Sequence, residues 1–487
     1  MSGDGAGAGP FDNYFRVIAG AGGLRSWDEL VGWVRDSAAA IDAGSEAIAE
    51  QMEQKSLGLA EGWALLDSAK AIVARHLMVR RTLQEADQPA DFLIARSDPD
   101  ALSAYLTEQR EHRTAVVSLH LLGSESLVVI VAANFPLPGR YGSGGTFYNM
   151  IRVNKIRDTL LPAVDAYAAS VDAGRPDFAV IREPLTFLGR VLMAMLGGAV
   201  PFEIIFIPHR SLHVLPLHAL QLADDETVVL HDIVSVIRYC TSMSDLVYGS
   251  MSISEHRPTR PHVLSVVDDT VGLAGVEIEK RVTDVLRHQA GEQAVVETLT
   301  AAADLPTTFT DHSWINWNSH ARSSSTTIGG SYLSLGDSRI TAESIASRWR
   351  LPGRPHVVLA ACQTALDTAA TATIDEYCGL DLAFRVAGAR TVTATMWRVA
   401  DPVAAFVSMM VTAGSLQHGT EPARTVTRLQ RAMHHGTWQQ ALLRPDQLRQ
   451  LPPHVAELVD SVQAPFRRLP ANAFADPACW AVFRCHG

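Results

Sequence analysis

Two short segments of the sequence each carry a reactive side chain directly after a run that is typical of a buried strand. The run Trp314–Asn318 is followed by His320, and the run His356–Ala361 is followed by Cys362. Largely apolar runs of this length are typical of strands inside a parallel sheet. In open α/β sheets, reactive groups gather at the carboxyl ends of the strands. If the two strands are neighbours, the imidazole and the thiol lie on either side of one cleft.

A thiol beside an imidazole is the smallest set of groups that can act as an activated thiol nucleophile. The histidine takes the thiol proton or stabilises the thiolate, and it then donates a proton to the leaving amine. Each residue also has a plainer interpretation, because buried free cysteines and satisfied core histidines are common. The strand-end positions of His320 and Cys362 favour catalysis, and the two assignments stand or fall together.

Strand-like and helix-like segments alternate along most of the chain. Strands are predicted near 114–122, 127–133, 203–207, 234–239, 262–267, 314–318, 356–361 and 391–396. Helices are predicted between them, near 153–172, 184–196, 379–387, 402–413 and 421–434. This alternation predicts an α/β fold with a mostly parallel sheet covered on both faces. Ahead of it, helical periodicity near 26–41 and 57–83 predicts an N-terminal helical hairpin.

The composition excludes several classes of function. The chain has 41 basic and 52 acidic residues and a formal net charge of −11, without a dense basic run, so binding to nucleic acid or an anionic membrane is not expected. It has no secretory signal and no uninterrupted apolar stretch of about 20 residues. Five cysteines in 487 residues do not make a disulfide framework, which favours a cytoplasmic protein with reduced thiols. No phosphate-binding loop or common zinc spacing is present, so no cofactor and no metal are expected.

Several motifs, taken in order, resemble those of the CHAT peptidases, which are relatives of caspases and separases. They are FIPHRSLHVLPLHAL, WINWNSHA, GGSYLSLGDSRITAESIASRWRLPGRPHVVLAACQTAL, DEYCGLDLAFRVAGARTVTATMWRVAD and DPACWAVFRCHG. The resemblance spans about 100–487, and the spacing of roughly 40 residues from histidine to cysteine is close to that of caspases. It implies a duplicated caspase-like fold with a flexible leader (1–23), a helical region (24–99), a pseudo-caspase half (100–255) and a catalytic half (256–487).

The resemblance also implies roles for individual residues. His320 would be the general base and Cys362 the nucleophile, and backbone N–H groups near Ala321 and Cys362 would form the oxyanion hole. Ala321 stands where the family usually has glycine. If the turn requires a positive φ, alanine would strain the oxyanion hole.

Three acidic residues are candidates for binding the substrate residue that precedes the cut. Asp401 resembles an acid that lines this pocket in separase-like relatives, and a carboxylate there would suit an arginine because the pair can be bidentate. Asp375 and Glu376 lie nearer the nucleophile in sequence and are alternatives. Asp401 is an equally good N-cap, since it precedes Pro402 and an apolar helical run.

These features together predict an endopeptidase that cuts specific protein substrates. Because such an enzyme in the cytoplasm must be restrained, we expect it to be latent and to be controlled by an activating or inhibitory protein partner. The N-terminal helices are the expected site at which this partner acts. The resemblance further implies a role as an effector in bacterial defence or cell death. Two alternatives stay open: a catalytically inactive scaffold that binds a partner, favoured by Ala321, and a cysteine-dependent acyl transferase on the same fold.

Overall fold

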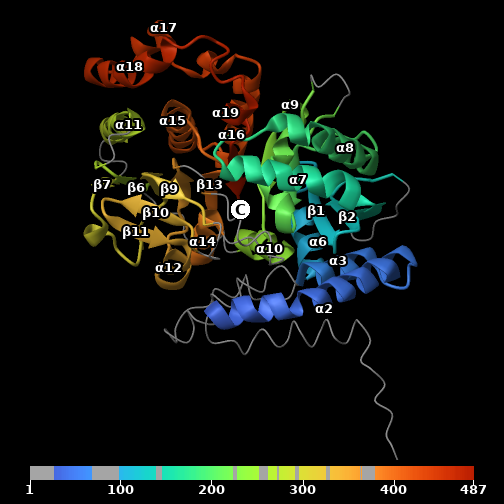
Figure 1. Ribbon diagram of the computed structural model, residues 1–487. Coiled ribbons are helices and arrows are strands. Elements are labelled where there is room, and N and C mark those ends of the chain that lie inside the picture. Colours follow the sequence, from blue (N-terminus) through green and yellow to red (C-terminus); the bar gives the residue numbers. More distant parts are fainter. Residues whose placement is uncertain are drawn as a thin grey trace, which may run out of the picture.

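A computed structural model describes residues 27–68, 98–138, 145–222, 228–251, 261–270, 274–290, 295–324, 330–361, 364 and 379–487. Its centre is an 11-stranded sheet with the order β3-β2-β1-β4-β5-β14-β13-β12-β8-β6-β7 (Figure 1). The strands are β1 (Thr114–Leu122), β2 (Ser126–Ala133), β3 (Phe147–Asn154), β4 (Glu203–Ile207), β5 (Val236–Tyr239), β6 (His262–Val267), β7 (Val295–Leu299), β8 (Trp314–Asn318), β12 (His356–Leu359), β13 (Thr391–Thr395) and β14 (Phe483–His486). A separate small sheet contains β9 (Ala321–Arg322), β10 (Tyr332–Leu335) and β11 (Ser338–Thr341).

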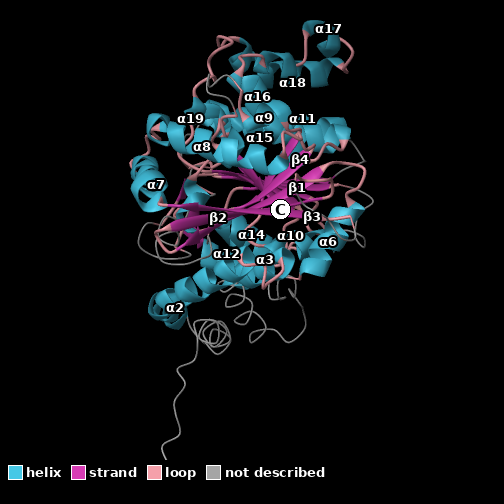
Figure 2. Cartoon of the chain, turned by 90° about the vertical axis from the view of Figure 1, so that its right-hand side faces the viewer, coloured by secondary structure: helices cyan, strands magenta, loops and turns pink. Residues whose placement is uncertain are grey.

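Helices cover both faces of the large sheet, which lies between them as a middle layer in Figure 2. The upper layer contains α7 (Ile156–Asp172), α8 (Phe178–Leu196), α9 (Leu230–Ile233), α11 (Ala274–Ala290), α15 (Asp401–His418), α16 (Pro422–His434), α17 (Pro445–Leu448), α18 (Pro453–Arg467) and α19 (Pro477–Trp480). The lower layer contains α2 (Trp27–Glu53), α3 (Leu59–Ser68), α6 (Pro99–Glu108), α10 (Met243–Met251), α12 (Ala342–Arg348) and α14 (Leu380–Ala387).

The strands form where the sequence has continuous apolar runs, because both of their faces are covered. Every residue of β1, β2, β4, β8 and β13 is buried. The pairs β1–β4, β4–β5, β6–β8, β8–β12 and β12–β13 are parallel. The predicted α/β class with a mostly parallel, helix-covered sheet is therefore confirmed. Two helices, α2 and α3, pack together where the N-terminal helical hairpin is predicted, and residues 69–83 of the predicted second helix lie outside the described residues.

β14 joins the two halves of the sheet. It runs antiparallel to β13 of the second half and pairs in parallel with β5 of the first half, through His486 and Tyr239. The predicted boundary near residue 255 falls in 252–260, and the predicted leader falls in 1–26, both outside the described residues.

The sequence analysis missed the two edge strands. β3 and β7 are half-buried or exposed along their length, so they mix polar and apolar residues and lack the continuous apolar run of the inner strands. Among the described residues, none of the helices combines the length and the apolar character that crossing a membrane requires.

Candidate active site

The pairing of β8 with β12 brings the two predicted catalytic segments to the same edge of the sheet. The strands are parallel neighbours in which Trp317 pairs with Leu359, and the Ala360 N–H donates to the Trp317 carbonyl at 2.9 Å. His320 therefore follows Trp317 by the same number of residues as Cys362 follows Leu359, the partner of Trp317 in this register. Cys362 itself lies outside the described residues, as do the pocket candidates Asp375 and Glu376.

Thr395 of β13 holds the chain on both sides of residues 362–363. Its hydroxyl donates to the carbonyl of Ala361, and its backbone N–H donates to the Thr364 hydroxyl at 2.9 Å. Thr364 and Thr395 are fully buried. These bonds fix the two ends of the short segment that contains Cys362.

His320 follows β8 with an exposed side chain and a firmly held backbone. Its carbonyl accepts hydrogen bonds from the Ser334 N–H at 2.8 Å and from the Ser334 hydroxyl at 3.0 Å. The next residue, Ala321, pairs with Leu333 in the small sheet. Ala321 is not among the residues with positive φ, so its methyl group introduces no left-handed strain into the backbone beside His320.

A small pocket opens at this edge between the strand ends and the first turns of α11 and α15. Its lining consists of Val276, Glu279, Asn318, Ser319, Ala360, Asp401, Ala404 and Ala405. It encloses about 20 Å³, which is room for one water molecule.

Asp401 contributes a half-buried carboxylate to this pocket. It is the first residue of α15, but the N-cap position belongs to Ala400, and the helix start has no side-chain capping bond. Within the described residues, the Asp401 carboxylate has no hydrogen-bonding or ion-pairing partner. The geometry therefore favours pocket binding over capping as the use of this side chain.

Glu279 of α11 is a second acid in the pocket, and the sequence analysis did not identify it. Its side chain is buried, and neither carboxyl oxygen has a hydrogen-bond partner. Burial raises the pKa of Glu279 to about 7, and the nearby side chains of Ser408 and Asn318 only moderate that rise. The signal was available: a charged residue stands on the otherwise apolar helix stripe that includes Val276 and Val282.

Polar atoms of Ser408 and Asn318 lie close enough to Glu279 to lower its pKa, but they do not reach the geometry of a hydrogen bond. The hydroxyl of Ser408 and both amide atoms of Asn318 are buried and lack a hydrogen bond. Buried polar groups are usually paired, so a cluster of unpaired ones beside a pocket indicates a missing polar ligand or water.

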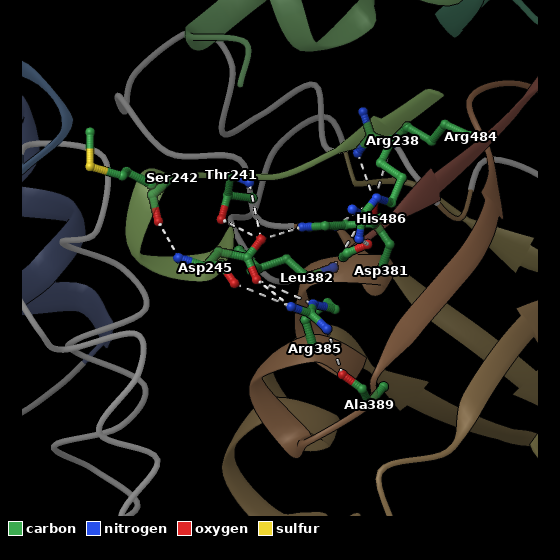
Figure 3. Close-up of polar contacts among 12 residues, drawn as sticks. Arg238, Thr241, Ser242, Asp245, Asp381, Leu382, Arg385, Ala389, Arg484 and His486 are labelled. Atoms are coloured by element: carbon green, nitrogen blue, oxygen red, sulfur yellow. Dashed lines mark hydrogen bonds and ion pairs between the residues drawn. The ribbon is translucent and has the colours of Figure 1, made fainter. Parts of the chain in front are cut away.

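A buried network of charges links α10, α14 and β14 (Figure 3). His486 of β14 contacts Asp245 of α10 through Nε2 at 2.7 Å and Asp381 of α14 through Nδ1 at 3.2 Å. Arg385 pairs with Asp245 at 2.8 Å, and Arg484 pairs with Asp381 at 2.7 Å. All five side chains are at most 2% exposed.

The network fixes the protonation state of its members. Burial alone would raise the pKa of Asp245 and Asp381, but the arginines and His486 outweigh it and hold both pKa values well below the usual range. Burial opposes the charged form of His486, yet the two carboxylates raise its pKa. Because the Asp381 N–H also donates to the carbonyl of Thr364 at 3.3 Å, the network positions the chain that follows Cys362.

Comparisons with known proteins agree with this geometry. A family model described as CHAT domain matches residues 182–487, which is more than half of the chain. The chain belongs to the CHAT domain family. No curated protein matches the sequence. The CHAT motifs quoted above therefore reflect family membership.

Solved structures show which fold this CHAT protein shares. It is similar to chains in two crystal structures of the Saccharomyces cerevisiae separase–securin complex, at 3.0 and 2.6 Å resolution. The TM-scores are 0.50 and 0.51 and the sequence identities 8% and 9%. The matches cover 98% of this chain and 40% and 38% of those chains, so this chain spans about two fifths of their length. The likeness establishes the caspase-like fold.

Proposed function

We propose that this CHAT protein is a cysteine endopeptidase with Cys362 as its nucleophile and His320 as its general base. The observation that carries the proposal is the parallel register of β8 and β12, which ends both catalytic segments at one sheet edge beside a pocket. Backbone N–H groups near Ala321 and Cys362 would serve as the oxyanion hole. The extended backbone at Ala321 supports this assignment, since it removes the strain on which the scaffold alternative depended.

The reactivity of the thiols tests the dyad without any need for substrate binding. An imidazole partner raises the thiolate fraction at neutral pH, so Cys362 is expected to react with iodoacetamide faster than every other cysteine. Burial raises the pKa of Cys240 and Cys485, and both thiols are inaccessible. Peptide mass spectrometry at pH 6.5 should show that Cys362 is the first cysteine to be labelled. In His320→Ala, the labelling rate of Cys362 should be at least about tenfold lower. Equal rates in the two proteins would contradict the dyad.

We further propose that the residue before the cut is basic. The support is the pairing of Asp401 with Glu279 in one pocket among buried polar atoms without partners. A guanidinium or ammonium group would satisfy these atoms and would favour the ionised form of Glu279. Asp375 and Glu376 stay alternatives for the same role.

The size of the pocket supports latency. A free volume of about 20 Å³ does not admit an arginine side chain, so side chains of the lining, or α11 and α15 themselves, would shift when a substrate binds. A cavity of about 570 Å³ among α11, α15, α16 and α18 leaves these helices incompletely packed on their far side. We propose that an activating or inhibitory protein partner controls this movement, as part of an effector role in bacterial defence or cell death. The separase likeness is to a protein solved in complex with a protein partner, securin.

Peptidyl ketone probes that carry Arg, Ala or Leu before the warhead test the specificity. We expect Cys362 to react with the Arg probe in preference to the others, and Cys362→Ala to abolish labelling. Replacing Ala404, which lines the pocket, by glycine should widen the pocket and speed up the Arg probe selectively. Rapid labelling by the Leu probe alone would contradict a basic preference. Recovery of acyl-enzyme without peptide cleavage would favour the acyl transferase instead.

A further inference from the structure

A second cluster of reactive side chains lies at the opposite edge of the sheet from His320. It consists of His262 at the start of β6, Glu297 on β7 and His312 just before β8. One ligand atom from each residue can be chosen such that all three lie within 4.8 Å of one another. The residues come from three adjacent chain segments with no motif spacing, which is why the sequence did not indicate them.

The contacts within this cluster have distances typical of ligands around one ion. Nε2 of His262 lies 3.2 Å from Oε1 of Glu297, and Nε2 of His312 lies 3.5 Å from Oε2. A tetrahedral ion with bonds of about 2.0–2.2 Å separates its ligand atoms by about 3.3–3.6 Å. The two imidazole rings lie together with centroids 4.2 Å apart.

The orientation of the rings distinguishes a shared ion from simple ion pairs. Despite these distances, Nε2 of His262 and both nitrogens of His312 are buried and make no hydrogen bond. The ring N–H directions therefore do not point at the carboxylate oxygens. His312 is only 8% exposed, and among the described residues its ring nitrogens have only the 3.5 Å contact with Glu297, so its burial is costly unless another ligand binds it. Burial, followed by the neighbouring His262, lowers the pKa of His312 and keeps it in the neutral form that binds metal.

We propose that His262, Glu297 and His312 bind a first-row divalent cation of the zinc type. Two imidazoles and one carboxylate form a donor set that suits Zn²⁺ and leaves a position for water. The half-exposed Glu297 gives the ion a path from solvent. The ion clamps β7, the outermost strand on this side, to β6 and to the chain entering β8.

A second histidine cluster lacks these properties and provides the internal control. His231, Asp232 and His434 also lie within reach of a common ion. However, His231 Nε2 is 3.3 Å from His434 Nδ1, and Asp232 already accepts from His435 at 2.7 Å. The Arg431 guanidinium donates to the His231 carbonyl, which places a positive charge beside the cluster. Apart from Nδ1 of His231, the ring and carboxylate atoms of this cluster therefore already have partners, and the adjacent guanidinium repels a cation.

Zinc binding to the full chain tests the proposal. The experiment uses Cys362→Ala throughout, because this change removes the thiol that the proposed active site would offer to the same ion. After chelator treatment and desalting, isothermal titration with Zn²⁺ should give one bound ion per chain. Glu297→Gln and His312→Gln should each weaken binding at least about tenfold, while His434→Gln should leave it unchanged.

Three results would overturn the proposal: no stoichiometric zinc binding, equal binding in Glu297→Gln, or loss of binding in His434→Gln instead. Glu297 is 49% exposed, so its substitution tests the site even if His312→Gln does not fold. Visible absorption of the Co²⁺-loaded protein, absent in Glu297→Gln, is the second expected readout and reports on the ligand geometry.

Discussion

The buried charge network allows a quantitative prediction for Asp245→Asn. The substitution keeps the shape of the side chain but removes a carboxylate that lies 2.8 Å from Arg385 and 2.7 Å from His486. Because the carboxylate and its partners are at most 2% exposed, the change leaves buried positive charge uncompensated. Breaking one partner of a buried ion pair typically costs about 3–5 kcal/mol. At about 2–4 °C per kcal/mol for a domain of 150–250 residues, the melting temperature should fall by roughly 6–20 °C, toward the lower end in this longer chain.

The assay is differential scanning calorimetry of wild type and variant between pH 4 and pH 9. Asp446→Asn is the matched control, because Asp446 pairs with Arg444 at 3.4 Å with both side chains more than half exposed. Such a pair contributes about 0–1 kcal/mol. A fall for Asp245→Asn no larger than that of the control would refute the reasoning.

The pH dependence of this difference has a definite sign. The pKa of Asp245 is lower in the folded than in the unfolded protein, so its stabilisation is present above the unfolded pKa of about 3.9 and is lost as pH falls through the folded pKa. The pKa of His486 is raised, so its contribution is complete below about 6.5 and is lost as pH rises through the folded pKa. The difference between wild type and Asp245→Asn should therefore be largest in weakly acidic solution.

Three further predictions concern the proposed active site. The ratio of Arg-probe to Leu-probe labelling rates should rise through about pH 7 as Glu279 ionises and should be flat in Glu279→Gln; a flat wild-type ratio would count against this acid. Asp401→Asn should slow the Arg probe by about 10- to 100-fold and leave the Leu probe unchanged, as measured by intact mass, because a charged hydrogen bond is worth about 1.5–3 kcal/mol. Ala321→Gly should leave the iodoacetamide rate at Cys362 within about twofold and lower stability by about 0.5–1 kcal/mol, and a large gain in rate would show that alanine does impair the site.

The sequence could predict those parts of the fold in which the environment of a segment demands one kind of residue. An inner strand needs a continuous apolar run, so segments such as 203–207 and 314–318 were placed correctly. Edge strands such as 147–154 face solvent and have no such requirement, so they were missed. The pairing of β8 with β12, the strands that precede His320 and Cys362, could be expected from the strand ends and the family motifs, because both are local in sequence.

Side chains that act through distant partners could not be predicted in this way. His486 and Asp245 are separated by 241 residues, and neither looks unusual until β14 is placed beside β5. Glu279 lies on the apolar face of a helix. The hydrophobic periodicity identifies the helix, but it does not indicate what a charged residue does on its buried face. Such groups are visible only when burial and missing partners can be measured.

The central position of β14 has a consequence for synthesis on the ribosome. This strand follows all the other described strands in sequence, yet it lies between β5 and β13 in the middle of the sheet. Until residues 483–486 have been made, each half presents an open strand edge, and His486 is missing from its contacts with Asp245 and Asp381. A prematurely terminated chain would therefore expose strand edges that can pair with other chains, which favours aggregation.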